Sequence, residues 1–183
     1  MDKKASFFEK YQPIFVVVCG YLGQGWKVNL LDDCKYRIKL TSPNFKGFNI
    51  FINIEKKRFK IDGCVSSRFY RGEYFTCTLS LDRKIDDIAR TIETKILSHA
   101  KEEIIKARNA LEAHQKAQEE DKIIKGMLSR LVTLSNHHNA FTGFNTDNNL
   151  SGNITRNYAG YGVEVKGLTI DQMIKLTCFI NSL

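Results

Sequence analysis

Positively charged and aromatic side chains alternate along the first half of this chain, and together they could hold a polyanion. Three of the cations recur at every second residue, as they would on one side of a strand. The cations are Lys27, Lys35, Arg37, Lys39, Lys57, Arg58, Lys60, Arg68 and Arg71. The aromatic residues interleaved with them are Phe45, Phe51, Phe69 and Tyr70. Because cations pair with phosphates and rings stack on bases, this combination is typical of sheets that bind single-stranded nucleic acid.

The distribution of charge agrees with an anionic partner but does not require one. The chain of 183 residues has a net charge of +8, and residues 1–82 hold most of the excess, with 14 Lys and Arg against 8 Asp and Glu. A polyanion would therefore be attracted to the N-terminal half. The same residues would also suit a solvated outer sheet face, where lysines protect exposed edges. The sequence lacks the K/R-G-F-G-F-V-x-F signature of an RNA-binding domain, so both interpretations stay open.

Three other motifs resemble known sites, and each lacks a part that its chemistry needs. The glycines of residues 20–26 have the spacing G-x-x-G-x-G, the reverse of the dinucleotide-binding order. Residues 145–151 alternate like calcium ligands, but they supply one carboxylate and no glycine at the turn. His137 and His138 are adjacent, so on regular structure they point apart. The sequence therefore predicts no cofactor, no metal and no catalytic residue, and the protein is expected not to be an enzyme.

The cysteines indicate a reducing compartment. The chain has five, Cys19, Cys34, Cys64, Cys77 and Cys178, and no two of them form a C-x-x-C motif. An odd number without that motif favours free thiols over a disulfide framework. No segment approaches the roughly 20 apolar residues of a membrane span. We therefore expect a protein of the cytoplasm with no membrane partner.

The first part of the chain predicts a sheet. Apolar residues at every second position, bounded by Gly, Pro, Asn and Asp, indicate antiparallel strands with one buried face. The expected strands are Ile14–Cys19, Trp26–Leu30, Tyr36–Leu40, Phe48–Ile54, Phe59–Ile61 and Phe75–Leu81. A short helix over residues 4–12 is expected to precede them and to end at Pro13. Strands that follow one another in this way predict a meander.

The middle of the chain predicts a long helix that covers the sheet. Apolar residues recur at spacings of three and four from about residue 85 to residue 114. The stripe changes from isoleucine to alanine, so we expect the first turns to pack on the sheet. Residues 100–118 would then meet another helix or form a homodimer with a second copy of the chain. A second helix is expected over residues 123–134, folding back after the acidic residues 119–121.

The last part of the chain predicts less regular structure. Residues 136–161 are rich in Asn, Gly and Thr and are expected to form a long loop or a weak hairpin. A strand over Gly162–Leu168 and a helix over Thr169–Leu183, with Thr169 as its N-cap, would follow. The expected fold class is α+β, in a single domain. Its portions are a basic sheet over 1–82, helices over 83–135, and a loop with a strand and helix over 136–183.

Several segments follow one another in a characteristic order along the chain. They are Gly25-Trp26, Phe48–Ile54, Arg58–Ile61, Leu79–Ile92 and Val165–Thr169. In this order of features the chain resembles small accessory proteins of bacteriophages and prophages. The resemblance implies an origin in a mobile element rather than a known activity. Basic phage proteins of this size often bind nucleic acid or inhibit host defence complexes such as CRISPR effectors. We therefore expect a non-enzymatic protein that binds a host protein or nucleoprotein complex in the host cytoplasm. The alternative from the residues themselves is a module that binds DNA or RNA alone through the basic sheet face.

Overall fold

The chain divides into two compact units, residues 1–114 and residues 115–183, which we call the first and second units. The computed structural model describes residues 6–32 and 34–183. Both units combine helices with an antiparallel sheet, which confirms the α+β fold class. The portions expected from the sequence, 1–82, 83–135 and 136–183, do not coincide with these units, because one helix continues from Ser98 to Leu128.

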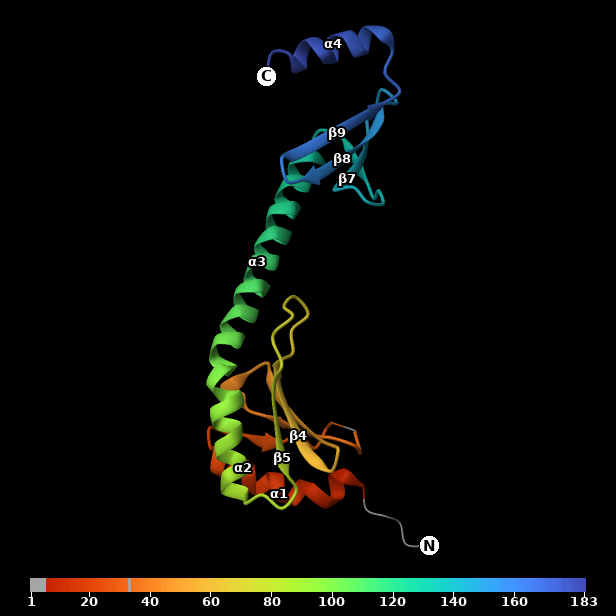
Figure 1. Ribbon diagram of the computed structural model, residues 1–183. Coiled ribbons are helices and arrows are strands. Elements are labelled where there is room, and N and C mark those ends of the chain that lie inside the picture. The colour runs from red at the N-terminus through yellow and green to blue at the C-terminus, as the bar shows by residue number, and fades with distance from the viewer. Residues whose placement is uncertain (1–5, 33) are drawn as a thin grey trace, which may run out of the picture. The chain divides into compact units, whose positions relative to one another are not determined.

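The first unit contains the predicted antiparallel meander (Figure 1). Its five strands lie side by side in the order in which the chain enters them. They are β1 (Lys27–Val28), β2 (Ile38–Thr41), β3 (Phe48–Glu55), β4 (Arg58–Val65) and β5 (Phe75–Ser80). Alternate residues face a core that includes Ile50, Ile52 and Ile61, each of them fully buried. The period of two in the sequence therefore reports a sheet with one covered face.

The expected strand Ile14–Cys19 is wrong, because these residues belong to helix α1 (Phe7–Leu22). Residues 4 and 5 of the expected short helix lie outside the described residues. A capping box starts α1: the Ser6 hydroxyl accepts from the Glu9 N–H at 3.2 Å, and the Glu9 carboxylate accepts from the Ser6 N–H at 2.7 Å. Pro13 does not end the helix, because burial of the apolar stripe outweighs the hydrogen bond that a proline removes. That stripe is Tyr11, Phe15, Val18 and Leu22.

The long helical segment covers the same face of the sheet, as predicted. It begins with α2 (Ile85–Ile92), passes through one π-helical turn (Glu93–Leu97) and continues as α3 (Ser98–Leu128). Residues at every fourth position, Ile88, Ile92, Ile96 and Ala100, are fully buried. A stripe with this spacing drifts around an α-helix, and the wider π turn brings it back toward the sheet. Gly63 of β4 allows the approach, since a Cβ there would overlap the Ile96 side chain.

The second unit differs from the expectations for this part of the chain. The expected helix over 123–134 is wrong, because α3 continues to Leu128. Residues 119–125 contain no glycine or proline, so the acidic run does not interrupt the helix. Part of the expected long loop over 136–161 is regular, because the chain forms a four-stranded antiparallel sheet. Its strands are β6 (Thr133–Ser135), β7 (Thr142–Asn145), β8 (Ser151–Asn157) and β9 (Gly160–Lys166).

The second unit has a small core and ends in the predicted helix. Its buried apolar side chains are Phe144 and Ile154. Helix α4 (Ile170–Ile180) begins at Thr169, whose hydroxyl accepts from the Gln172 N–H while the Gln172 side chain accepts from the Thr169 N–H. This capping box confirms the N-cap read from the sequence.

Candidate functional site

The outer face of the first sheet, opposite the core, carries part of the predicted basic and aromatic set. In the strand register Lys39 of β2 lies opposite Phe51 of β3, and Phe51 lies opposite Asp62 of β4. Lys60 lies on the same face, one pair further along, opposite Asn53. Alternate residues of adjacent strands share a face, so the pleat itself brings these side chains together.

Two cations lie near the Phe51 ring. The Arg37 guanidinium carbon is 5.1 Å from the ring centroid, and the Lys39 Nζ is 5.6 Å from it. Both distances fall within the range of a cation–π interaction. The structure therefore brings three of the predicted residues, Arg37, Lys39 and Phe51, into one cluster.

A cavity of about 590 Å³ opens beside Phe51, and we call it the outer groove. The segment between β4 and β5 forms its other wall. Its lining residues are Phe51, Cys64, Val65, Ser66, Ser67, Tyr70, Arg71, Gly72 and Tyr74. Three of these, Phe51, Tyr70 and Arg71, were predicted site residues. Aromatic rings, hydroxyl groups and a guanidinium thus surround one open space. Cys64 also lines it, and burial raises the pKa of its thiol, which favours the uncharged form.

Glu103 of α3 holds the wall of the outer groove in place. Its buried carboxylate accepts from the Tyr70 hydroxyl at 3.0 Å, from the Glu73 N–H at 3.2 Å and from the Lys106 ammonium at 3.0 Å. Burial alone would raise the pKa of Glu103, but these hydrogen bonds outweigh it and hold the pKa below the usual 4.5. A Cβ at Gly72 would lie 2.8 Å from the Glu103 Oε2, so glycine allows this close approach.

Two of the predicted cations are paired with acids on the outer face. Arg37 donates two hydrogen bonds of 2.9 Å to Asp32, and Lys60 lies 3.0 Å from Glu55. The bond from Arg37 lowers the pKa of Asp32, and the bond from Lys60 lowers the pKa of Glu55. These pairs reduce the net positive charge that the outer face presents to a polyanion.

The remaining cations do not gather into one patch. Lys39, Arg58 and Arg71 form no ion pair within residues 6–32 and 34–183. Lys57 sits in the turn between β3 and β4, and Lys35 precedes β2. The sequence therefore predicts which part of the chain carries the positive charge, but it does not predict where on the surface the cations cluster.

Three other members of the predicted set have different surroundings. Phe45 is not a contact residue, because it is buried and stacks on Trp26 with ring centroids 5.5 Å apart. Phe69 stacks on His114 of α3 with ring centroids 4.1 Å apart, and the Arg68 guanidinium carbon lies 5.9 Å from the centroid of the Phe69 ring. These contacts fasten the segment between β4 and β5 to the helix.

Tyr74 is a groove residue that the sequence reasoning missed. It lies just before β5 and is 73% exposed, so its ring is free to contact a ligand. The feature of the sequence that could have indicated Tyr74 is the group of aromatic residues within 69–75, of which only Phe69 and Tyr70 belong to the predicted set.

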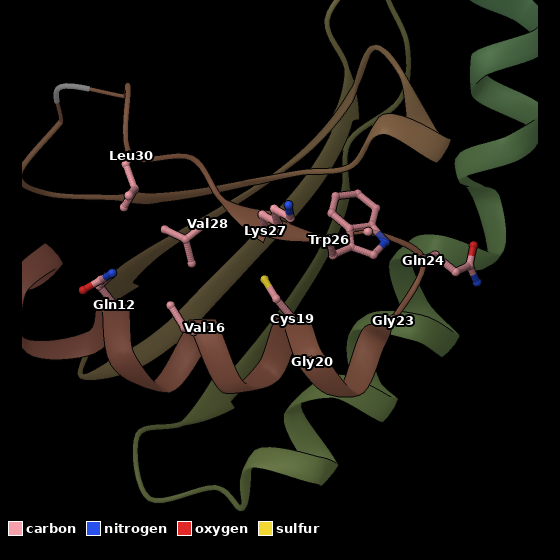
Figure 2. A pocket seen from close by; sticks show the side chains of 11 residues that line it. Gln12, Val16, Cys19, Gly20, Gly23, Gln24, Trp26, Lys27, Val28 and Leu30 are labelled. Carbon is pink, nitrogen blue, oxygen red and sulfur yellow. The ribbon is translucent and has the colours of Figure 1, made fainter.

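A second cavity of the first unit has a different chemistry. It has a volume of about 470 Å³ and lies between α1 and the segment that enters β1 (Figure 2). Val16 and Cys19 line one wall, while Trp26, Val28 and Leu30 line the other. Burial raises the pKa of the Cys19 thiol to about 11, so this group stays protonated at neutral pH. Of the predicted cations, Lys27 lines this second cavity.

Among residues 6–32 and 34–183, no cluster of three or more His, Cys, Asp or Glu side chains could hold a metal ion. Within the same residues, no helix is long and apolar enough to cross a membrane. Comparison of the chain with protein families, curated proteins and solved structures found no match. The function of this chain is therefore inferred from its residues and their arrangement.

Proposed function

We propose that the first unit binds single-stranded nucleic acid in the outer groove. The observation that carries this proposal is the Phe51 ring, which borders the groove and lies against the cationic groups of Arg37 and Lys39. A base has a flat face that stacks on such a ring, and its phosphates pair with nearby cations. Tyr70 and Tyr74 offer further rings, and Arg71 offers a guanidinium on the opposite wall.

Each side chain has a defined part in this proposal. Phe51 stacks on one base and Tyr74 on a neighbouring base, while Lys39 and Arg71 contact the phosphates. The hydroxyl groups of Ser66 and Ser67 can donate to phosphate oxygens or base edges. None of these contacts reads a sequence strongly, so the proposed binding tolerates many sequences and weakens as salt rises.

Fluorescence anisotropy with labelled oligo-dT and oligo-rU tests this proposal. Phe51→Ala removes one stacking platform and is expected to weaken binding by about 1–3 kcal/mol, or roughly 5- to 150-fold. Lys39→Gln is expected to reduce the slope of log K against log salt by about 0.7, the value for one lost phosphate contact. Lys101→Gln, an exposed lysine on α3, is the matched control and should change neither quantity.

Two results would contradict the proposal. One is a wild-type chain that binds neither strand at physiological salt. The other is equal loss of binding in the Lys39→Gln and Lys101→Gln variants, which would point to general charge attraction instead of the outer groove.

A host nucleoprotein defence complex is the second candidate partner. The observation that favours it is the pairing of Arg37 with Asp32 and of Lys60 with Glu55, which leaves modest attraction for nucleic acid alone. A nucleoprotein target in the host cytoplasm would add protein contacts to those with its bases and phosphates, as the resemblance to phage accessory proteins implies. Pull-down from a bacterial lysate with and without nuclease tests this candidate, and recovery of no ribonucleoprotein or deoxyribonucleoprotein partner would contradict it.

A further inference from the structure

Helix α4 presents an apolar surface that the chain itself does not cover. No residue of α4 is buried. The apolar side chains Ile170, Met173, Ile174 and Ile180 on one side of α4, and Phe179 on the other, are between 52% and 74% exposed. An isolated helix of 11 residues is only marginally stable in water, and packing of its apolar side supplies most of its stability. The apolar side of α4 would therefore be stabilised by packing against a partner.

The small core of the second unit points the same way. Its 69 residues bury the apolar side chains Phe144 and Ile154, whereas Ile123 and Met127 on the second-unit part of α3 are more than 60% exposed. A domain of about this size needs most of its apolar surface covered to be stable. Association with a further protein surface would supply the missing burial.

The pattern along α4 is complementary to itself. Ile170, Met173, Ile174, Thr177 and Ile180 recur at spacings of three and four and so lie on one stripe. If two copies of α4 run antiparallel, Ile170 of one meets Ile180 of the other, and Met173 with Ile174 meets Thr177. Each large side chain then faces either an isoleucine or the smaller threonine, in the layers that antiparallel helix pairs form. A two-fold interface requires this symmetry, because the same surface serves both partners.

The charges also allow a second copy to be the partner. The second unit carries 7 Lys and Arg against 6 Asp and Glu, whereas the first carries 21 against 14. Two second units can therefore meet with little repulsion. Helices that lie on anionic membranes have polar faces rich in Lys and Arg, and α4 has Lys175 as its single cation.

We propose that the apolar stripe of α4 pairs antiparallel with α4 of a second copy of this chain, forming a homodimer. This inference does not depend on the proposed nucleic-acid binding. It also places the dimer contact away from residues 100–118, where Ala100 and Glu103 are buried within the first unit. The interface between two helices of this length is small, so we expect a weak dimer that dissociates on dilution.

Sedimentation velocity over a range of concentrations tests the dimer. The wild-type chain should approach twice its 21.0 kDa mass as concentration rises. Ile174→Glu places a charge on the stripe and should raise the dissociation constant at least tenfold. Lys175→Glu changes the charge of the adjacent residue on the opposite side of α4 and should leave the dissociation constant within about twofold. A wild-type monomer at all concentrations, or equal effects of the two variants, would overturn the proposal.

Disulfide formation between two variants tests the antiparallel register. In a background in which Ser replaces Cys34 and Cys178, Ile170→Cys and Ile180→Cys should not cross-link when each is oxidised alone. A mixture of the two should give a covalent dimer. Residues ten positions apart on one helix are separated by roughly 15 Å, so a parallel pair would join like residues and could not join residue 170 to residue 180. Self-cross-linking of either variant alone, or a mixture that stays monomeric, would overturn the register.

Discussion

Glu103 shows how one buried side chain can govern a site that it does not line. It is 2% exposed on α3, yet it accepts hydrogen bonds from the Tyr70 hydroxyl and the Glu73 N–H. Tyr70 lines the outer groove, and Glu73 lies three residues further along the same segment. Burial and the bond to Glu103 raise the pKa of Tyr70, so its hydroxyl remains a donor at neutral pH. The rigidity of the groove therefore depends on a carboxylate contributed by a distant part of the sequence.

Glu103→Gln is expected to destabilise the chain by about 1–3 kcal/mol at pH 7, because it weakens hydrogen bonds to a buried charge. The folded state lowers the pKa of Glu103 below 4.5, so its stabilisation is present above that pH and is lost as pH falls further. Urea unfolding of wild type and variant from pH 7 to pH 3 should thus show a difference that shrinks in acid.

Glu102→Gln provides the control for this measurement. Glu102 also contacts Lys106, at 2.8 Å, but its side chain is 69% exposed. An exposed pair contributes little, so this variant should stay within about 0.5 kcal/mol of wild type. If Glu102→Gln and Glu103→Gln cost the same, Glu103 does not act as the anchor described above.

At the scale of the elements, the contact between β4 and the long helical segment depends on a glycine. Gly63→Ala places a methyl group where the Ile96 side chain packs, so the helix or the strand must move. Overpacking of this kind costs about 1–3 kcal/mol in free energy of unfolding. Gly126→Ala on α3 meets no atom within 4 Å and is expected to be neutral or stabilising. Thermal unfolding of the two variants checks the pair, and a neutral Gly63→Ala would contradict the described packing.

Strands of the first sheet could be predicted because one covered face produces an alternation of apolar and polar residues, which is strict in β5. Helix α1 could not, because Val16 and Val17 fill the gaps in its buried stripe and make a continuous β-branched run. Both valines are about half exposed, so tertiary packing and the Ser6 cap decide the helix against local preference.

The candidate site was predicted less completely than the sheet. Phe51, Lys39 and Arg37 share a face because of the pleat, which the sequence pattern contains. Phe45 has the same residue type as Phe51, but Phe45 is buried and packs on Trp26, whereas Phe51 is half-buried. The position of Tyr74 depends on the contacts that its segment makes with α3, from Phe69 to His114 and from Tyr70 to Glu103. These contacts join residues far apart in the sequence, so no local pattern predicts them.

At the scale of the whole molecule, the two units contain very different amounts of buried apolar surface. The core of the first unit includes fully buried side chains from α1, β2, β3, β4 and the long helical segment. That of the second unit contains Phe144 and Ile154. Units with separate cores open separately, and the one with less buried surface opens at lower free energy. Below the concentration at which copies associate, amides of β7–β9 should therefore exchange faster than those of β3 and β4.

Phe144→Ala and Phe59→Ala extend this prediction to each unit. Truncation of a buried phenylalanine costs about 3 kcal/mol or more, which accelerates amide exchange by roughly a hundredfold where that side chain is needed. Phe144→Ala should remove protection from β7–β9 and leave β3–β5 unchanged, whereas Phe59→Ala should do the reverse. Hydrogen exchange read by mass spectrometry separates the two sheets. Loss of protection throughout the chain in either variant would mean that the two units unfold as one, and the small core around Phe144 would then be stabilised by cooperation with the rest of the protein.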